Sequence, residues 1–243
     1  MTAAAPEEVL ITTIARLLAG SRHVAVGVLS PIPGAAALLV REREGAKVSI
    51  IGSRDPAYRI GSVALFDLAA QGRIDAFFLS GGQIDGGANV NLVGIGAYPT
   101  MQVRWSGSFG SAFLYHLIPK VILFREEHTP RTLVERVDFV SAAGSSPPGT
   151  HRPGGPHALV TGRGLFLWQR DEGRFRLVSV HPGSDLADIR ARTGFDFDVE
   201  EPLPVTALPD QEELRTLRSA VAPQLGSIYP QFARRLWGAP AAA

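Results

Sequence analysis

The hydrophobic positions in the first eighty residues alternate between a helical spacing and short apolar runs. Residues 6–20, "PEEVLITTIARLLAG", place apolar side chains on one helical face between Pro6 and Gly20. Proline at the start and glycine at the end favour a helix over this segment. The next segment, "RHVAVGVL", is a nearly unbroken apolar run. Such a run predicts a strand that is covered on both faces.

The same order of patterns continues along the chain. "SPIPGAAALLVREREG" predicts a helix that starts after Pro33 and ends at Gly45, and "KVSIIG" predicts the strand after it. "VALFDLAAQG" then predicts another helix and "IDAFFLS" another strand. Strands that alternate with helices form mainly parallel sheets with helices packed on them. The sequence therefore predicts an α/β fold.

The second half of the chain is richer in strand-like patterns. "QVRWSG", "KVILFREE" and "VDFVSAAG" predict strands, whereas proline and glycine predict a loop over residues 145–156. Residues 157–183 predict further strands, with Asp171 to Gly173 as the turn of a hairpin. A capped helix is predicted from Ser184 to Arg192, closed by Gly194, and a last helix over "DQEELRTLRSAV". With no repeat or long linker, we expect a single domain over residues 1–243, frayed at about 1–5 and 238–243.

Composition excludes several classes of protein. The 243 residues are 45% hydrophobic and 19% charged, which is enough to bury a sizeable core. A formal net charge of +1, spread along the chain, predicts no basic face for nucleic acid. The chain has no cysteine, which excludes a thiolate nucleophile, a Cys-ligated zinc and a disulfide. Without a basic leader or an apolar run of ~18 residues, we expect a cytoplasmic protein with no membrane partner.

Common catalytic motifs are missing. The histidines never form a helical i, i+4 pair with a glutamate between them, so we expect no metal site. Gly94 and Gly96 begin a G-x-G without the third glycine of a dinucleotide site. Glu126, Glu127 and His128 follow the strand "KVILF", where catalytic side chains of α/β sheets often lie. Base rates favour a structural strand end for this cluster.

Two glycine-rich stretches are stronger candidates. "GGQIDGGANVN", residues 81–91, fits either a tight hairpin or the wall of a binding site, with Asp85 ordering the turn. "SGSFGS", residues 106–111, comes before "AFLYHLI", a segment that could open a helix. It is either a simple turn or a bend whose backbone N–H groups bind an oxyanion or phosphate. The residues alone leave both alternatives open.

The same stretches resemble one family. "GGQIDGGANVN", "RVDFVSAAG", "GSFGS" and "SVHPGSDLADIRARTGFDFDV" are similar to segments of the beta subunits of family I coenzyme A-transferases. Glutaconate CoA-transferase and the ring-opening CoA-thioester hydrolases of steroid degradation are the most similar members. The resemblance runs from about Glu8 to about Pro223. It implies a twisted, mainly parallel sheet flanked by helices, of NagB/RpiA-type architecture.

The resemblance also implies a partner and a substrate. The expected partner is an alpha subunit of similar fold, in a heterodimer or heterotetramer with the active site at the subunit interface. The expected substrate is an acyl-CoA thioester, with no permanently bound cofactor. The residues expected to bind substrate or CoA are Gly81, Gly82, Gln83, Asn89, Asn91, Gly107, Ser108, Phe109, Gly110 and Ser111.

One departure concerns the nucleophile. In the transferases a beta-subunit glutamate, at the end of the strand that corresponds to "KVSIIG", attacks the thioester. Here that position is Ile51, and no carboxylate follows before Asp55. Phe109 likewise stands where the transferase loop has glycine. We therefore keep three hypotheses: a CoA-transferase-like beta subunit, a CoA-thioester or C–C bond hydrolase that uses a partner carboxylate, and a non-catalytic CoA-binding subunit.

Overall fold

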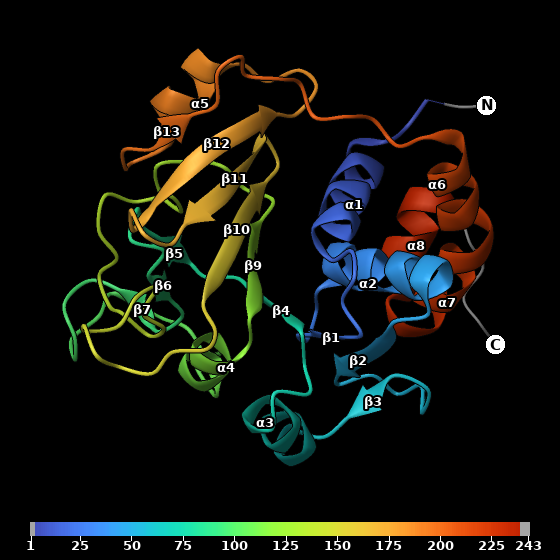
Figure 1. Ribbon diagram of the computed structural model, residues 1–243, viewed down its shortest axis with the longest axis horizontal. Coiled ribbons are helices and arrows are strands. Elements are labelled where there is room, and N and C mark those ends of the chain that lie inside the picture. Colours follow the sequence, from blue (N-terminus) through green and yellow to red (C-terminus); the bar gives the residue numbers. More distant parts are fainter. Residues whose placement is uncertain (1–2, 239–243) are drawn as a thin grey trace. The chain divides into compact units, whose positions relative to one another are not determined.

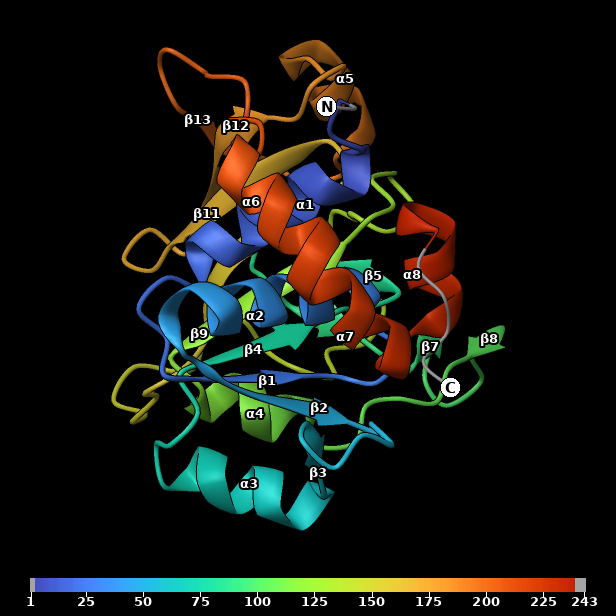
Figure 2. The same cartoon turned by 90° about the vertical axis from the view of Figure 1, so that its right-hand side faces the viewer.

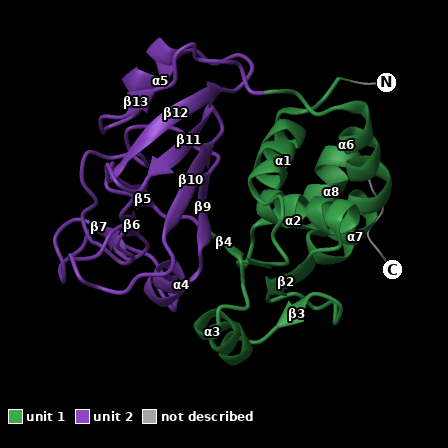
Figure 3. Ribbon diagram, viewed as in Figure 1, with its two compact units in different colours: residues 1–78, 207–243 green, residues 79–206 purple. Residues whose placement is uncertain are grey.

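The protein consists of two compact units (Figure 3). The computed structural model describes residues 3–238. Unit 1 combines the residues up to Phe78 with those from Ala207 onward, and unit 2 spans Leu79–Thr206. Each unit is described by itself below. That the whole chain acts as one domain stays a prediction.

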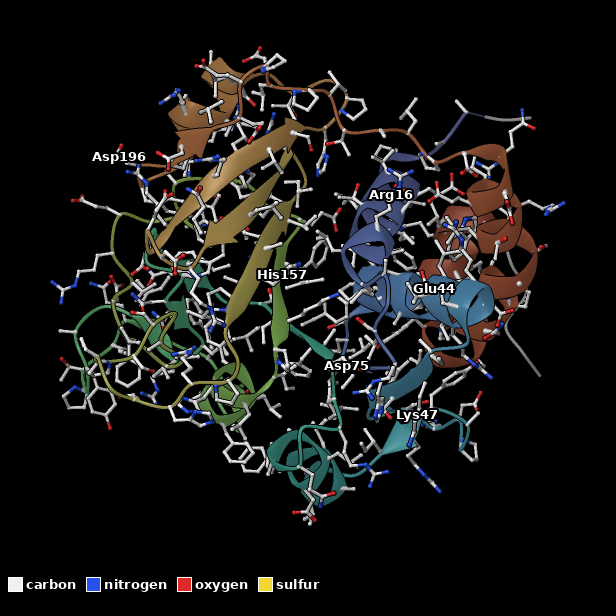
Figure 4. All side chains as sticks on the ribbon, in the orientation of Figure 1. Arg16, Glu44, Lys47, Asp75, His157 and Asp196 are labelled. Atoms are coloured by element: carbon white, nitrogen blue, oxygen red, sulfur yellow. The ribbon has the colours of Figure 1, made fainter. Side chains whose placement is uncertain are left out.

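The strands of unit 1 are parallel, as the alternating pattern predicts. They are β1 (His23–Val26), β2 (Lys47–Ile51), β3 (Arg59–Ile60) and β4 (Ala76–Leu79), in the order β4-β1-β2-β3. All residues of β1 and β4 are buried, which explains their unbroken apolar runs. Asp75 fixes the segment before β4, because its carboxylate accepts hydrogen bonds from the backbone N–H groups of Arg22 and His23 at 2.8 and 2.9 Å (Figure 4).

Helices cover both faces of these strands. α1 (Pro6–Leu17), α2 (Pro31–Glu44) and α3 (Ser62–Ala70) form where the sequence predicts them, although α2 begins at Pro31 and not after Pro33. α6 (Gln211–Thr216), the π-helical turn η1 (Leu217–Val221), α7 (Ala222–Ile228) and α8 (Pro230–Trp237) complete the unit. Figure 2 shows α1, α2, α6 and α7 above the strands and α3 below them.

The C-terminal part of the chain continues beyond the predicted last helix. α7 and α8 were not predicted, because Pro223 and Pro230 suggest an ending. Pro230 occupies the first position of α8, which tolerates proline, and Pro223 lies just after the π-helical turn η1. Of the ends expected to be frayed, Ala5 caps α1 and Gly238 caps α8. Residues 1–2 and 239–243 lie outside the described residues.

Buried ion pairs connect the N- and C-terminal helices of unit 1. The Glu8 carboxylate, 1% exposed, lies 2.7 Å from Arg218, and that of Glu213, 3% exposed, lies 2.7 Å from Arg16, which Figure 4 shows on α1. Each buried carboxylate also has a further side-chain partner, Arg43 for Glu213 and the Trp237 indole for Glu8. These pairs therefore hold α6–α8 in place against α1.

Unit 2 contains a mixed sheet. Its strands are β9 (Lys120–Arg125), β10 (Pro156–Thr161), β11 (Gly164–Gln169), β12 (Arg174–Val180) and β13 (Asp198–Val199), in the order β9-β10-β11-β12-β13. β9 and β10 are parallel, as are β12 and β13, whereas β11 is antiparallel to both neighbours. The hairpin predicted to turn at Asp171 to Gly173 is the β11–β12 pair, whose turn spans residues 170–173 (Figure 1). With unit 1, this confirms a mainly parallel α/β fold.

Two helices and several two-residue strands complete unit 2. α4 (Ser111–Leu117) follows the predicted glycine bend, and α5 (Leu186–Arg192) is capped by Asp185, not by Ser184 as predicted. The two-residue strands are β5 (Gln83–Ile84), β6 (Val90–Asn91), β7 (Gly94–Ile95) and β8 (Val103–Arg104). None of the helices within residues 3–238 has the length and apolar character needed to cross a bilayer.

One predicted strand is wrong. "VDFVSAAG", residues 137–144, forms only an isolated bridge between Ala142 and Val90. Its backbone and side chains bond to the β5–β6 region instead: the N–H of Val137 donates to the Asp85 carboxylate, and the Ser141 hydroxyl donates to the carbonyl of Val90. The apolar run therefore packs as an irregular segment, because its hydrogen bonds go to side chains and single bridges.

Candidate functional site

The stretch "GGQIDGGANVN" is a hairpin, as one of the two alternatives predicts. β5 and β6 pair antiparallel, with Gln83 opposite Asn91. The Asp85 carboxylate orders the turn by accepting hydrogen bonds from the backbone N–H groups of Gly87 and Asn89, both at 3.0 Å. The Asn89 amide also donates to it, at 3.1 Å. Asp85 is thus the residue that fixes the shape of this turn.

The hairpin amides form an internal network. The buried Nδ2 of Asn91 donates to the Gln83 side-chain oxygen and to the Gly94 carbonyl, both at 2.7 Å. The Gln83 oxygen also accepts from the backbone N–H of Asp138 at 2.9 Å. Within residues 3–238, the NH₂ group of Gln83 donates to no acceptor, so it is the part of this network left for a ligand. A substrate-binding role for Gln83, Asn89 and Asn91 stays a prediction.

A cavity of about 480 Å³ lies beside this hairpin, wholly within unit 2. Two of the predicted site residues, Gly81 and Gly82, line it, and so does Ser106 at the start of the second glycine stretch. A Cβ atom on Gly82 would lie 2.0 Å from the Trp105 ring, so only glycine lets this indole pack against the hairpin. The remaining lining residues are Ser80, Leu92, Ile95, Val103, Trp105, Arg125, Arg131 and Thr132.

The charged wall of the cavity was missed by sequence reasoning. Arg125, the last residue of β9, lies 2.9 Å from Glu127, and Arg131 lies 2.8 Å from the other oxygen of the same carboxylate. These hydrogen bonds lower the pKa of Glu127 to about 2. At neutral pH the carboxylate is therefore ionised and too weakly basic to act as a general base. Two guanidinium groups and one carboxylate leave a net positive charge at the cavity.

The Glu126–Glu127–His128 cluster is divided among different environments. Glu126 is exposed, Glu127 forms the ion pairs just described, and His128 is buried. The His128 ring lies 2.8 Å from the Thr161 hydroxyl and 2.9 Å from that of Thr193, and burial lowers its pKa to about 4. These contacts fit a structural role for His128, and the role of the cluster stays a prediction. Within residues 3–238, no group of three or more His, Asp or Glu is placed to hold a metal ion.

The predicted glycine loop is a turn that directly follows the cavity residues Trp105 and Ser106 in the sequence. Gly110 caps α4 with a left-handed φ of 72°, which favours glycine there. Both the N–H and the hydroxyl of Ser111 donate to the Ser108 carbonyl, at 3.2 and 2.8 Å, so these donors are used within the turn. Phe109 is 80% exposed. Contact of Gly107, Ser108, Phe109, Gly110 and Ser111 with a substrate stays a prediction.

The strand end expected to carry a nucleophile has none. Ile51 ends β2 and lies opposite Ile60 of β3. The next carboxylate along the chain, Asp55, accepts a hydrogen bond from the backbone N–H of Ala57 at 2.9 Å and caps a local turn. Ile51 has no nucleophilic group, and the Asp55 carboxylate is bound within the turn that follows the strand.

Known proteins with similar sequences are subunits of CoA-transferases and of a ring-cleaving hydrolase. The chain is 30% identical over 153 residues to the beta subunit of glutaconate CoA-transferase from Acidaminococcus fermentans, which covers 60% of this chain and 56% of that protein. It is 32% identical over 158 residues to the beta subunit of 3-oxoadipate CoA-transferase from Pseudomonas knackmussii, a match that covers 62% of this chain and 60% of that protein. It is 28% identical over 166 residues to the cholesterol ring-cleaving hydrolase IpdB subunit of Rhodococcus jostii, a match that covers 66% of this chain and 64% of that protein. The matches thus span about three fifths of these relatives.

Solved structures extend the similarity to the whole chain. Glutaconate coenzyme A-transferase from Acidaminococcus fermentans matches with a TM-score of 0.76 over 98% of both chains, at 22% identity. The chain has the fold of glutaconate CoA-transferase. The decarboxylase AibA/AibB also matches this transferase-like fold, with a TM-score of 0.74 and 26% identity over 97% of this chain and 99% of that chain. No protein-family model matches.

The transferase-like fold confirms the architecture that the sequence motifs imply. Its relatives differ in the chemistry that their names describe, namely CoA transfer, ring cleavage and decarboxylation. Solved variants of the decarboxylase replace the same cysteine. This chain contains no cysteine, so it cannot supply a thiol to any such reaction.

Proposed function

We propose that the chain is the beta subunit of a heteromeric, cytoplasmic CoA-transferase-like enzyme that acts on an acyl-CoA thioester. The observation that carries the proposal is the likeness to glutaconate CoA-transferase, at a TM-score of 0.76 over 98% of both chains, together with 30% sequence identity to the beta subunit of such an enzyme. An alpha subunit of similar fold would complete the active site at the subunit interface. Coenzyme A is then part of the substrate, and no cofactor is permanently bound.

This chain's part in the chemistry is to hold the thioester. A carboxylate is a weak nucleophile toward a thioester, so the reactants must be fixed together and the tetrahedral oxyanion must be stabilised by donors already in place. The NH₂ group of Gln83 and the backbone of residues 107–110 are the donors we assign to that task. Because Ile51 occupies the family's glutamate position, the reacting carboxylate comes from the partner subunit or from the acceptor acid.

A second candidate is hydrolysis. Ile51 and the similarity to a ring-cleaving hydrolase subunit favour a reaction in which a partner carboxylate acts as general base on water or on the substrate. This version needs no nucleophile from this chain. The third hypothesis, a subunit that only binds CoA, is the outcome if neither reaction occurs.

The test uses the full chain purified together with its alpha subunit. A panel of acyl-CoA thioesters is incubated with and without acceptor acids, and both the new thioester and free CoA are measured. We expect turnover that requires both subunits. CoA transfer identifies a transferase, whereas CoA release without an acceptor identifies a hydrolase. A complex that binds the thioesters but turns over none of them contradicts the enzymatic proposal.

Borohydride trapping locates the nucleophile. In a transferase that uses a glutamate of this chain, reduction of the glutamyl-CoA thioester would label this subunit. Because Ile51 replaces that glutamate, we expect label only on the alpha subunit, or on neither. Label on this chain would contradict the role inferred from Ile51.

The glycine loop is tested by Gly110→Val. We expect kcat/KM for a good acyl-CoA to fall at least tenfold, because a β-branched residue is strained at a φ of 72° and displaces the loop backbone. Gly149→Val is the matched control, since Gly149 has a φ of 84° and lies in the predicted 145–156 loop. Thermal unfolding shows whether each variant is folded. If folded Gly110→Val turns over as fast as the control, the loop does not hold the thioester.

A further inference from the structure

The side chain of Phe109 is presented to solvent by an ordered turn. It is 80% exposed, and within residues 3–238 no other phenylalanine, tyrosine or tryptophan is more exposed. The turn is fixed after the ring, because Gly110 caps α4 and the Ser108 carbonyl accepts hydrogen bonds from both the N–H and the hydroxyl of Ser111. The exposure of the ring therefore belongs to a defined position of the backbone.

Helix packing offers a structural role for an apolar residue at this position. Phe109 precedes the cap of α4, and a residue there often packs against the fourth residue of the helix, here Leu114. Leu114 is 3% exposed, so its side chain is covered. A phenylalanine that packs in this way loses most of its exposed surface, whereas Phe109 keeps 80%. Stabilisation of α4 therefore accounts for little of the ring.

Backbone donors flank the ring. The N–H groups of Gly107, Ser108 and Gly110 donate to no residue in the described part of the chain. Under the proposed function, the backbone of this turn holds the oxygen of the reacting carbonyl. Neighbouring Cα atoms lie about 3.8 Å apart, so a ring attached between Ser108 and Gly110 then stands beside the acyl carbon.

The reaction at that carbon needs room for a second reactant. Because Ile51 supplies no carboxylate, we consider direct attack by the acceptor acid. Its carboxylate oxygen bonds to the acyl carbon, and the carbon–sulfur bond breaks with its electron pair on the CoA thiolate, which leaves a mixed anhydride. The thiolate then attacks the acceptor's carbonyl carbon, and the first acid leaves as a carboxylate. If water attacks the thioester instead, its oxygen bonds to the acyl carbon, one of its protons passes to the thiolate, and the free acid and CoA result.

A phenyl ring takes space from that reactant. Phe109 stands where the transferase loop has glycine, so its ring occupies space that glycine leaves open. Water needs room for one oxygen atom, whereas an acceptor acid brings its whole alkyl chain to the same carbon. The ring therefore obstructs long acceptors more than short ones.

From these features we propose that Phe109 limits the size of the acyl acceptor. Water and the shortest acids reach the acyl carbon, and longer acids do not. This inference rests on the proposed function, because it takes the reacting carbonyl to be held by the glycine loop. Phe109 is then a specificity-determining residue for the acceptor, a role separate from that of the donors in the loop backbone.

The first experiment varies the acceptor on the complex of the full chain with its partner subunit. The donor is the acyl-CoA that the complex turns over fastest, and the acceptors are water, acetate, butyrate and hexanoate. We expect kcat/KM for hexanoate to be at least tenfold below that for acetate. Equal values for the three acids overturn this inference and leave the proposed function standing. A complex that turns over no acyl-CoA overturns both.

The second experiment removes the ring. In Phe109→Ala we expect kcat/KM for hexanoate to rise at least tenfold relative to that for acetate, whereas Phe109→Tyr, which keeps a ring, should match the wild type. If the wild type accepts only water, Phe109→Ala should gain transfer to acetate. Phe113→Ala is the matched control, because it removes another exposed ring from α4 and should leave the acceptor preference unchanged. An equal change for every acceptor, or the same shift in Phe113→Ala, contradicts the proposal.

A third measurement separates the acceptor from the acyl group. Acyl-CoA donors of increasing chain length are hydrolysed without an acceptor acid by the wild-type complex and by the Phe109→Ala complex. We expect the same donor preference in both, because the ring acts on the acceptor. A donor preference that shifts when the ring is removed would place Phe109 against the acyl group and overturn the inference. Thermal unfolding checks that each variant is folded.

Discussion

At the scale of single residues, the glycines around the hairpin are required by packing. A Cβ atom on Gly82 would lie 2.0 Å from the Trp105 ring, and one on Gly81 would lie 2.6 Å from Val90. A Cβ on Gly94 would lie 2.1 Å from the Val103 carbonyl. The stretch is rich in glycine because its backbone touches an indole ring and a neighbouring strand, and not only because it turns.

The first prediction concerns Gly82→Ala. We expect the free energy of unfolding to fall by about 1–3 kcal/mol, because the new methyl group must displace the Trp105 ring. Chemical denaturation followed by tryptophan fluorescence measures this loss. The control is Gly27→Ala, where a Cβ would meet only the Ser30 hydroxyl at 3.7 Å, an ordinary contact. Equal stability of the two variants would show that the indole does not depend on Gly82.

At the scale of elements, one carboxylate organises the segments around the cavity. Asp85 accepts hydrogen bonds from Gly87, Asn89 and Val137, so it joins the hairpin turn to the irregular segment that follows β9. Hydrogen bonds to an ionised group are worth about 1.5–3 kcal/mol each when buried. Asp85 is 4% exposed, so its loss leaves several N–H groups without a partner.

The second prediction follows for Asp85→Ala. We expect destabilisation of about 3 kcal/mol, because the buried N–H of Val137 and the partly buried donors of Gly87 and Asn89 lose their acceptor. We also expect loss of protection from hydrogen exchange at residues 85–91 and 137. Asp138→Ala is the control, because the exposed Asp138 carboxylate accepts one backbone bond, from Gly96 at 2.8 Å. Its loss should cost about 1 kcal/mol or less. Similar losses in the two variants would contradict the organising role of Asp85.

The elements also show what a sequence can predict. α1 to α3 and the first long strands were predicted, because proline or glycine marks the helix ends and the buried strands β1 and β4 are unbroken apolar runs. Of the two-residue strands, β8 falls within the predicted strand "QVRWSG" and the β5–β6 hairpin was one of two alternatives, whereas β7 was not predicted. The segment 137–144 was predicted as a strand because an apolar run does not reveal where its hydrogen bonds go.

The candidate site was predictable in part for the same reason. Gly81 and Gly82 stood out because glycine beside amides is unusual in a strand. Trp105, Arg125 and Arg131 gave no comparable signal, because they come from separate segments that meet only in the folded unit. The charge balance of the cavity depends on which arginines share Glu127, and no local pattern contains that information.

At the scale of the whole molecule, buried histidines make stability depend on pH. Burial lowers the pKa of His128 and of His181 to about 4, from 6.5 in an exposed histidine, and Arg163 adds repulsion at His128. The pKa values of His23 and His157 are lowered by burial as well. Between pH 6.5 and 4, therefore, the unfolded chain binds more protons than the folded chain. The contribution of these histidines to the free energy of unfolding is fully present above pH 6.5 and is lost as the pH falls toward 4.

The third prediction is this acid sensitivity. Between about pH 7.5 and 5 we expect a loss of about 1–2 kcal/mol for each of His128 and His181 in the free energy of unfolding, measured by denaturant titration. Glu127 stays ionised over this range, because its pKa is about 2. Replacing His128 and His181 by glutamine should reduce the slope, whereas His151→Gln, at an exposed loop position, should not. An unchanged slope in the double variant would contradict the assignment.

The ion pairs of unit 1 have a consequence for how the chain is made. Glu8 and Arg218 are separated by 210 positions, and the whole of unit 2 is translated between them. On the ribosome, α1 emerges with a carboxylate whose partner is not yet synthesised, and it stays uncovered until the last helices appear. The strands of unit 2 come from one continuous stretch of the chain, so their pairing does not wait for a later segment. Synthesis therefore favours folding of unit 2 before α1 pairs with the helices that follow Ala207.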